Sequence, residues 1–328
     1  MMKDTEISRR GFLSGAALAL GGAVLATESA FGFPAYIKNL GKPNSMFNGV
    51  QVGAITYSWR SLPGSAEDIL RYCQECNISA IELMGPTAEE FAGAPKGPAF
   101  QRGPQTDQQK AERAEYAKKI ADWRAAVSMD KFTQLRKMYN KAGVSIYAYK
   151  PSALGANNTD AEVDYACRAA KALGASHTTV ELPTDPAQSL RLGKIAAQHK
   201  VYIGYHGHLQ QTYDAWDKAM EQSKYNAMNF DMGHYVAAGH EPLKFITDKH
   251  QHILSMHTKD RKNKANGGEN VAWGEGDTPI VEALQLIRNS KYKFPASIEL
   301  EYPIPAGSDA IKETAKCVEY ARKALEAS

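Results

Sequence analysis

The sequence predicts an α/β fold in which strand–helix units close into a single (β/α)8 barrel, the TIM-barrel architecture. From residue 50 onward, short apolar runs alternate with amphipathic stretches about eight times, the count that such a barrel needs. Strands that alternate with helices in this way pair in parallel. No glycine-rich phosphate turn follows the first strand, where residues 56–64 read TYSWRSLPG, and this disfavours the rival open doubly wound sheet.

The first two strands and the helix between them begin the barrel. Residues 51–59 (QVGAITYSW) and 80–84 (AIELM) are apolar runs that predict strands, and residues 66–76 have helical spacing. Residues 85–127 follow, rich in Gly, Pro and Gln before they become charged and helical. A segment of that length is too long for an ordinary loop. We therefore predict an insertion after the second strand that acts as a lid or binding element.

The alternation resumes after the insertion and continues to the end of the chain. The remaining strands are predicted at residues 144–150, 177–182, 201–208, 225–231, 253–259 and 294–301. The remaining helices are predicted at residues 129–142, 160–173, 186–199, 212–223, 242–248, 279–289 and 309–326. Because strands and helices alternate throughout, we expect one barrel over residues 50–328.

The amino terminus predicts an export signal. Arg9 and Arg10 lie in residues 8–13 (SRRGFL), which match the twin-arginine pattern, and a run of small apolar residues follows. That run is too short and too rich in Gly and Ala to span a bilayer well, which disfavours an uncleaved membrane anchor. We therefore predict a twin-arginine signal peptide at residues 1–30, a linker at 31–49, and a periplasmic or otherwise exported protein with no stable membrane span once the signal is removed.

Composition and charge narrow the range of partners. The chain is 43% hydrophobic and 23% charged, as soluble globular proteins are, and its formal net charge is +3. That charge is too small to indicate a nucleic-acid partner. Cys73 and Cys76 share one face of a helical pattern, which favours packing over redox chemistry or a disulfide framework. The sequence leaves the oligomeric state open, a homo-oligomer included.

Metal-ligand side chains stand at the C-terminal ends of several predicted strands. Glu181 ends the fourth strand, Asp231 the sixth, His257 the seventh and Glu299 the eighth. The C-terminal ends of barrel strands meet on one face, so these side chains converge. A lone Glu or His at a strand end is usually an ion-pair partner or a structural side chain, but all of these fall at the same end of their strands. Together they predict an oxygen-rich, one-imidazole site for one divalent metal ion, either Mn, Mg, Co or Zn.

Three short motifs carry a family resemblance. Residues 231–234 (DMGH), 255–260 (SMHTKD) and 298–301 (IELE) resemble, in order and spacing, the sugar phosphate isomerase/epimerase-like proteins of the xylose isomerase-like TIM barrel superfamily. The likeness spans about residues 50–326. Each motif is short, but their ordered combination is fairly specific. The resemblance implies the same barrel fold and the same set of metal ligands.

The resemblance also implies roles for individual residues. Glu181 and Glu299 would serve as catalytic acid and base in addition to binding metal, and His234 would contact a substrate oxygen. This chain departs from the ketose epimerases of the superfamily in its insertion, its export signal and its paired His206 and His208. The resemblance therefore does not identify the substrate.

Further side chains are candidates for substrate contacts, each with a structural alternative. His206 and His208 share a strand face and could donate to substrate or add a metal ligand; alternatively, one of them caps a helix. Lys259 could polarise a carbonyl, or it pairs with a glutamate. The other candidates lie at strand ends or in a loop that we expect to be mobile, with core packing, ion pairing or loop anchoring as the alternatives: Lys150, Glu82, Tyr57, Arg261 and Trp273.

These observations favour a metal-dependent carbohydrate enzyme. A carboxylate would remove the proton next to a sugar carbonyl and a metal would stabilise the enediolate, which gives isomerisation or epimerisation. Elimination from the same intermediate would make the protein a 3-keto-glycoside lyase or hydratase. Export and the lack of a phosphate-binding Gly turn favour a neutral sugar or glycoside as the small-molecule substrate. A metal-dependent phosphodiesterase needs more ions and a basic groove, and a non-catalytic sugar binder would not need both glutamates, so both are less favoured.

Overall fold

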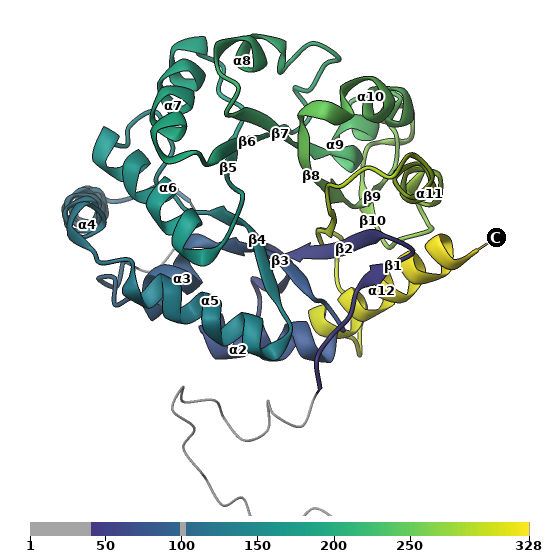
Figure 1. Cartoon of the computed structure of the whole chain (residues 1–328), viewed down its shortest axis with the longest axis horizontal. Coiled ribbons are helices and arrows are strands. Elements are labelled where there is room, and N and C mark those ends of the chain that lie inside the picture. Colours follow the sequence, from purple (N-terminus) through teal and green to yellow (C-terminus); the bar gives the residue numbers. More distant parts are fainter. Residues whose placement is uncertain (1–40, 99–102, 328) are drawn as a thin grey trace, which may run out of the picture. The chain divides into compact units, whose positions relative to one another are not determined.

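The strands of the computed structural model close into one parallel barrel. The structure describes residues 41–98 and 103–327. Its main sheet has the strand order β1-β2-β11-β8-β7-β6-β5-β4-β3, and a further pairing of β2 with β3 closes the ring. All pairings within the ring are parallel, and the helices surround it (Figure 1). The predicted (β/α)8 barrel is therefore confirmed.

The barrel strands are short and follow the apolar runs of the sequence. In chain order they are β2 (Val50–Ile55), β3 (Ala80–Met84), β4 (Ser145–Lys150), β5 (His177–Glu181), β6 (Tyr202–His206), β7 (Asn226–Asp231), β8 (Ile253–Thr258) and β11 (Ala296–Ile298). Outside the ring, β1 (Met46–Phe47) pairs antiparallel with β2. A separate antiparallel ribbon is formed by β9 (Asp260–Arg261) and β10 (Asn270–Val271).

The helices begin and end where the sequence supplies capping residues. The α-helices are α2 (Ala66–Glu75), α3 (Gly85–Phe91), α4 (Asp107–Ala126), α5 (Asp130–Ala142), α6 (Asp160–Leu173), α7 (Pro186–His199), α8 (Asp217–Gln222), α9 (Met232–Ala237), α10 (Pro242–Lys249), α11 (Ile280–Ser290) and α12 (Ala310–Glu326). Short 3-10 turns are η2 (Thr56–Trp59), η3 (His250–His252) and η4 (Lys264–Asn266). Thr159 begins α6 with a capping box, and Gly174 ends it in the left-handed conformation.

Polar side chains fill the barrel interior below the C-terminal strand ends. The hydroxyl of Tyr147 donates to Ser297 Oγ at 2.5 Å, and His177 Nε2 lies 2.9 Å from Ser255 Oγ. Burial lowers the pKa of His177 to about 4, so this imidazole is neutral. Glycine is needed at position 53, because an added Cβ would lie 2.9 Å from the Tyr147 ring. These side chains fill the barrel directly below the residues at the strand ends.

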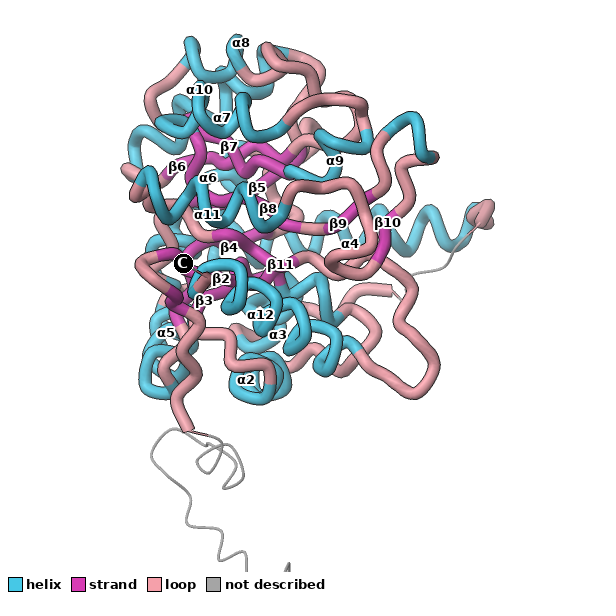
Figure 2. The backbone as a smooth tube through the Cα atoms, turned by 90° about the vertical axis from the view of Figure 1, so that its right-hand side faces the viewer, coloured by secondary structure: helices cyan, strands magenta, loops and turns pink. Residues whose placement is uncertain are grey.

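The predicted insertion after the second strand is largely helical and is fixed to the barrel. Helix α4 extends beyond the strand ends on the same side as β9 and β10 (Figure 2). The buried guanidinium of Arg124, on α4, donates to Glu89 Oε1 at 2.9 Å and to Glu162 Oε1 at 3.0 Å. Glu89 belongs to α3 and Glu162 to α6, so one buried ion-pair triad joins both helices of the insertion to the barrel wall.

One short strand extends the sheet on the N-terminal side of the barrel. Strand β1 extends the sheet beyond β2, and Ser45 Oγ donates to the carbonyl oxygen of Val52 at 2.6 Å. The end of the segment predicted as a linker, residues 31–49, thus belongs to the sheet, because main-chain groups of β2 find partners there. The predicted signal peptide at residues 1–30 and the first part of the linker lie outside the described residues.

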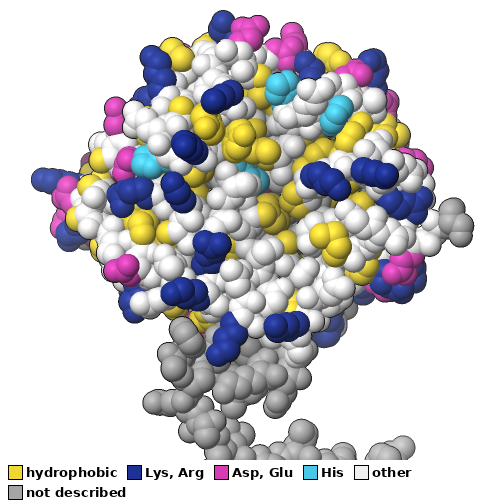
Figure 3. Space-filling model, in the orientation of Figure 1, with side chains coloured by type: hydrophobic (Ala, Val, Ile, Leu, Met, Phe, Trp, Pro, Cys, Tyr) yellow, Lys and Arg dark blue, Asp and Glu magenta, His cyan; other side chains and the backbone are white. Residues whose placement is uncertain are grey.

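The described surface carries dispersed charge. Lysine and arginine side chains are spread over the face drawn in Figure 3 rather than gathered in one groove. None of the helices in the described ranges is both long and apolar enough to cross a bilayer. The thiols of Cys73, Cys76, Cys167 and Cys317 are all free and buried, which fits the predicted packing role.

We predict that Arg124→Met lowers the free energy of unfolding by about 3–5 kcal/mol, because it leaves two buried carboxylates without their shared cation. Urea denaturation followed by circular dichroism measures this change. Lys118→Ala on the exposed side of the same helix is the control, expected within about 0.5 kcal/mol of wild type. Equal stability of the two variants would contradict the anchoring role of Arg124.

Candidate active site

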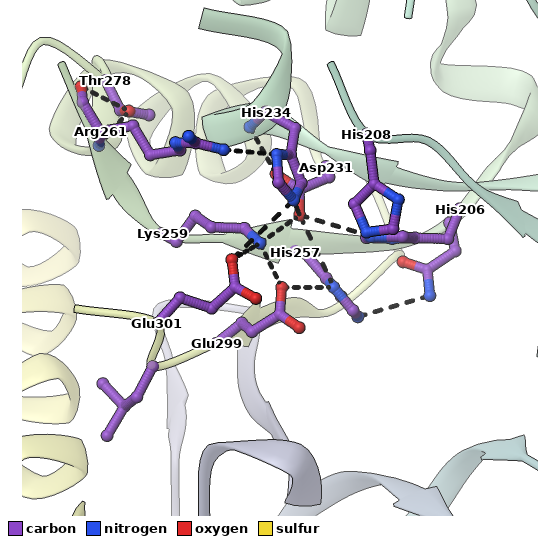
Figure 4. A network of polar contacts seen from close by, with 12 residues as sticks. His206, His208, Asp231, His234, His257, Lys259, Arg261, Thr278, Glu299 and Glu301 are labelled. Atoms are coloured by element: carbon purple, nitrogen blue, oxygen red, sulfur yellow. Dashed lines mark hydrogen bonds and ion pairs between the residues drawn. The ribbon is translucent and has the colours of Figure 1, made fainter. Parts of the chain in front are cut away.

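Four buried side chains converge at the C-terminal ends of neighbouring strands. His206, Asp231, His257 and Glu299 each offer one ligand atom, and these atoms all lie within 4.8 Å of one another. They are neighbours because β6, β7, β8 and β11 follow one another around the ring, and the register pairs Asp231 with His257. Figure 4 shows this cluster and the polar contacts around it. The structure thus brings together all but one of the predicted metal ligands, with His206 as the fourth member.

Glu181, the remaining predicted ligand, lies at the rim instead. Its side chain is 47% exposed, with Oε1 2.9 Å from Lys150 Nζ and Oε2 3.1 Å from His208 Nδ1. The interior place beside His257 is occupied by the fully buried Glu82. A second carboxylate there would repel the first, whereas the rim offers Glu181 a cation and solvent. The structure therefore does not place Glu181 among the four clustered residues.

Glu82 orients His257 rather than facing the barrel mouth, as a substrate contact would. Glu82 Oε2 lies 2.8 Å from His257 Nε2, and Glu82 Oε1 accepts a hydrogen bond from Thr179 Oγ1 at 2.5 Å. With Nε2 directed at Glu82, His257 turns Nδ1 toward Glu299 Oε2, 3.1 Å away. A carboxylate behind the far nitrogen of a histidine is the usual support of a metal-ligating imidazole.

The charges around His257 favour positive charge at this point. Burial alone lowers the pKa of His257, but the carboxylates of Glu299 and Glu82 outweigh it and raise that pKa to about 10. Burial also favours the neutral form of Glu82 and so raises its pKa, but the positive charges of His257 and Lys150 outweigh burial and lower that pKa to about 2. Both glutamates therefore stay ionised, and the imidazole between them is stabilised by a proton or by a bound cation.

Two buried atoms of the cluster, Asp231 Oδ2 and His206 Nδ1, have no hydrogen-bond partner. Asp231 Oδ1 accepts from the main-chain N–H of His234 at 2.7 Å. Oδ2 lies 3.8 Å from both His206 Nε2 and His257 Nδ1, and 3.0 Å from Lys259 Nζ as an ion pair without hydrogen-bond geometry. Ligand atoms about 2.1 Å from one ion lie roughly 3–4 Å apart, so these residues fit a shared divalent cation.

His206 suits a ligand role because it is neutral. Burial, together with the positive charges of Lys150 and His257, holds the pKa of His206 well below its ordinary value. A neutral imidazole has a free lone pair, which metal binding requires. Of the two uses that the sequence suggests for His206, substrate donor or extra ligand, the geometry supports the ligand. The site therefore contains two imidazoles, where the sequence predicts one.

Lys259 is the internal counter-ion of the carboxylates. Its buried ammonium lies 2.6 Å from Glu299 Oε2, 2.7 Å from Glu301 Oε2 and 3.0 Å from Asp231 Oδ2. Burial lowers the pKa of Lys259, but these carboxylates outweigh it and raise the pKa, so the lysine stays charged. Of the two predicted uses of Lys259, polarising a carbonyl or pairing with a glutamate, the structure shows the pairing. Glu301 is not among the site residues predicted from the sequence, although the alternation of IELE places it on the same strand face as Glu299.

His234 and Arg261 form a pair beside Asp231. Asp231 ends β7 and caps α9, which brings His234 back over the barrel mouth. Gly233 is required there, because an added Cβ would lie 2.8 Å from the carbonyl oxygen of Lys259. Arg261 Nη1 donates to His234 Nδ1 at 2.5 Å, and His234 Nε2 is buried without a hydrogen-bond partner. This position fits the predicted contact of His234 with a substrate oxygen.

The rim beside β5 and β6 carries Glu181, Lys150 and His208. The exposed imidazole of His208 lies edge-on to the rings of His206 and His234, with centroids 4.8 Å and 4.6 Å apart. His208 therefore bridges the buried cluster and the outer ion pairs of Glu181. With His206 pointing inward and His208 outward, the two predicted partners take different roles.

Tyr57 lies on η2, outside the four-residue cluster. One face of its exposed ring is covered by the guanidinium of Arg60, whose Cζ is 4.4 Å from the ring centroid. Arg60 Nη1 also donates to the carbonyl oxygen of Leu300 at 2.7 Å, so this pair joins the ends of β2 and β11 at the rim. Arg60 therefore covers one face of the Tyr57 ring, which the sequence suggests as a substrate contact.

The loop at residues 261–276, expected to be mobile, is fixed to the barrel. Asp260 Oδ2 accepts from the main-chain N–H groups of Gly274 at 2.8 Å and Gly276 at 2.9 Å. Trp273 packs edge-on against a tyrosine of α12, with ring centroids 5.8 Å apart. Trp273 is thus an anchor of its loop, the alternative to a sugar-stacking residue, and the loop presents Arg261 in a defined position.

The fold is that of a known family. A family model described as Xylose isomerase-like TIM barrel matches residues 70–321. No curated protein gives a significant match. Similar solved structures include the 3-keto-D-glucoside 4-epimerase from E. coli, with 10% identity, a TM-score of 0.58 and coverage of 84% of this chain and 99% of that chain.

Two further solved structures are similar at comparable identity. The IOLI protein with a bound zinc atom has 16% identity and a TM-score of 0.57, covering 85% of this chain and 100% of that chain. A xylose isomerase domain protein from Planctomyces limnophilus has 15% identity and a TM-score of 0.57, covering 84% of this chain and 97% of that chain. At these identities the likeness is one of fold.

Metal titration with a competing chelator distinguishes the two candidate fourth ligands. We expect His206→Ala to lower zinc affinity by more than about 100-fold, because an imidazole that contacts the ion directly is lost. Loss of a residue that only hydrogen-bonds to a metal ligand typically lowers the affinity by roughly 10- to 100-fold. Glu181→Gln is the matched variant and should leave the affinity nearly unchanged. The reverse ranking of the two variants would restore Glu181 as the ligand.

Proposed function

The chain belongs to the xylose isomerase-like TIM barrel family, and we propose that it is a divalent-metal-dependent enzyme that transfers a proton next to the carbonyl group of a sugar. The observation that carries this proposal is the buried cluster of His206, Asp231, His257 and Glu299 at the C-terminal strand ends. Side chains able to carry protons stand on two sides of that cluster. The combination supports enediolate chemistry of the isomerase or epimerase type.

Two imidazoles and two carboxylates would hold one divalent ion. When bound there, the ion supplies a Lewis acid that stabilises negative charge on the carbonyl oxygen of the substrate. The one-imidazole site that the sequence predicts suits Mn, Mg, Co or Zn. A second imidazole, from His206, favours Mn, Co or Zn over Mg, which prefers oxygen ligands. The zinc atom bound in the similar IOLI structure supports this choice.

Glu181 and His208 are the proposed proton carriers on the side of β5 and β6. His208 Nδ1 lies 3.1 Å from Glu181 Oε2, and a histidine oriented by a carboxylate is a common general base. In the proposed step this pair takes the proton from the carbon next to the carbonyl. The electrons of that C–H bond move toward the carbonyl oxygen, which gives the enediolate. The half-exposed pair can then exchange its proton with water.

Glu301 is the proposed proton carrier on the opposite side. It follows β11, which lies across the ring from β5, with three strands between them in either direction. Glu299, the acid or base implied by the resemblance, suits a ligand better. Burial raises the pKa of Glu299, but Lys259 and His257 hold it well below its ordinary value, so it is a weak base. Glu301 can take a proton from the Lys259 ammonium, 2.7 Å away, and deliver it to the other face of the same carbon, which is epimerisation. Delivery to the former carbonyl carbon, with a proton moving between the two enediolate oxygens, is isomerisation.

Elimination from a 3-keto-glycoside is the second candidate. The observation that favours it is the exposure of His208, which can give a proton to a departing oxygen. The enediolate electrons then form a carbon–carbon double bond as the glycosidic oxygen leaves with its bonding pair and accepts that proton. The similar 3-keto-D-glucoside 4-epimerase supports a 3-keto-glycoside as the substrate class for either reaction.

Exchange with solvent tests the shared mechanism. We expect the metal-loaded protein in deuterated water to place deuterium next to the carbonyl of 3-keto-glucosides or free ketoses, as measured by mass spectrometry. Glu181→Gln should slow this exchange by about 100-fold or more, since a positioned base contributes roughly 10²–10⁴ in rate.

The same experiment separates the two reactions. Lys118→Ala on α4 is the control and should exchange like wild type. An intact glycoside with inverted configuration indicates epimerisation, and a released aglycone indicates elimination. No metal-dependent exchange at any carbon would contradict the proposal.

Export by the twin-arginine route remains a proposal that rests on Arg9 and Arg10, which lie outside the described residues. It supports a neutral sugar or glycoside as substrate, because sugar phosphates are mainly cytoplasmic. Fractionation of cells that make the tagged chain tests it. We expect the wild type outside the cytoplasm and the Arg9→Lys, Arg10→Lys double variant inside it. Equal distribution of the two would contradict export by this route.

A further inference from the structure

Arg261 determines which ring nitrogen of His234 carries a proton. Arg261 Nη1 lies 2.5 Å from His234 Nδ1, and both side chains are buried. A guanidinium has only N–H donors and stays charged in proteins. His234 Nδ1 is therefore the acceptor and keeps its lone pair toward Arg261. A neutral imidazole whose Nδ1 is unprotonated carries its proton on Nε2.

Other contacts hold the arginine in this position. Its Nε donates to the carbonyl oxygen of Gly268 at 2.9 Å, and Nη2 donates to the same oxygen. The main-chain N–H of Arg261 donates to Thr278 Oγ1 at 3.0 Å. Gly267 and Gly268 have φ values of 94° and 69°, which glycine adopts readily, and this turn presents the Gly268 carbonyl to the guanidinium. The glycine-rich loop therefore fixes Arg261, and Arg261 fixes His234.

The opposite nitrogen, His234 Nε2, is buried and has no hydrogen-bond partner. Glu301 Oε2 at 3.9 Å and Asp231 Oδ2 at 4.0 Å are both beyond hydrogen-bond range. Nδ1 already accepts from the Arg261 guanidinium, so the ring has no free nitrogen for a second proton. A buried N–H without an acceptor is costly, and here it faces the barrel mouth. The geometry calls for an oxygen atom of a bound molecule at this point.

We propose that Arg261 is a positioning residue that fixes His234 as a neutral Nε2–H donor to a hydroxyl or carbonyl oxygen of the sugar, and that it thereby prevents His234 from binding a metal ion. The identity of the acceptor rests on the proposed sugar chemistry. The position of the proton does not, because it follows from the contact between Arg261 and His234 alone.

The position of the proton on His234 determines whether a second group of histidines can bind a metal ion. His206, His208 and His234 also lie with ligand atoms within 4.8 Å of one another. An imidazole binds metal through an unprotonated nitrogen. With Nδ1 committed to Arg261 and Nε2 protonated, His234 offers no lone pair to that group, and His206 already belongs to the four-residue cluster. The described site therefore holds one ion, which disfavours the cluster of ions that a metal-dependent phosphodiesterase uses.

Nitrogen NMR of wild-type protein labelled with ¹⁵N-histidine tests the proton position directly. His234→Gln identifies the His234 signals. We expect a protonated Nε2 and an unprotonated, hydrogen-bonded Nδ1 in the metal-free and the zinc-loaded protein alike. A protonated Nδ1, or a His234 Nε2 that binds zinc, would overturn the proposal. The measurement needs no turnover, so it stands or falls separately from the sugar chemistry.

Zinc stoichiometry tests the exclusion of a second ion. Wild type and the control Lys264→Met, on the exposed part of the same loop, should bind one zinc ion per chain. Arg261→Met frees Nδ1 of His234 and should allow a second zinc ion between His208 and His234, which the further change His208→Ala should remove. A second zinc ion in wild type, or a single one in Arg261→Met, would show that Arg261 does not exclude it.

Discussion

The buried carboxylate of Asp231 is the constraint on which the rest of the site depends. An ionised oxygen inside a barrel is costly unless positive charge or donors surround it. Main-chain donation from His234 satisfies Oδ1 at 2.7 Å, but Oδ2 has only Lys259 at 3.0 Å and imidazole nitrogens farther away. The groups around Asp231 supply or attract positive charge. A lysine lies on one side, and two imidazoles, whose arrangement suits a cation, lie on the other side.

Two residues behind the site give neighbouring histidines opposite functions by the same means. Glu82 accepts from Nε2 of His257, which leaves Nδ1 free to bind an ion. Arg261 donates to Nδ1 of His234, which leaves a proton on Nε2 for a substrate oxygen. One partner is an acceptor and the other a donor, so one histidine becomes a ligand and the other a hydrogen-bond donor. The difference lies in the supporting charge and not in the histidines.

Each sequence pattern reports one physical property, and that property limits what the pattern can predict. Alternating apolar runs report burial, so they predict the barrel and locate Asp231, His257 and Glu299 at the strand ends that meet. They do not report competition between side chains of the same type. Glu82 and Glu181 both stand near strand ends, and only packing decides that Glu82 lies inside. The choice between His206 and His208 is of the same kind, because both share one strand face.

The chemistry of the site depends most on an arrangement in which two imidazoles and two carboxylates share one ion while Glu181 stands at the rim. An anomalous difference map at the zinc edge, from crystals of zinc-loaded wild-type protein, tests it most directly. We predict one peak per chain, in contact with His206, Asp231, His257 and Glu299. A peak in contact with Glu181, or one between His208 and His234, would contradict the account.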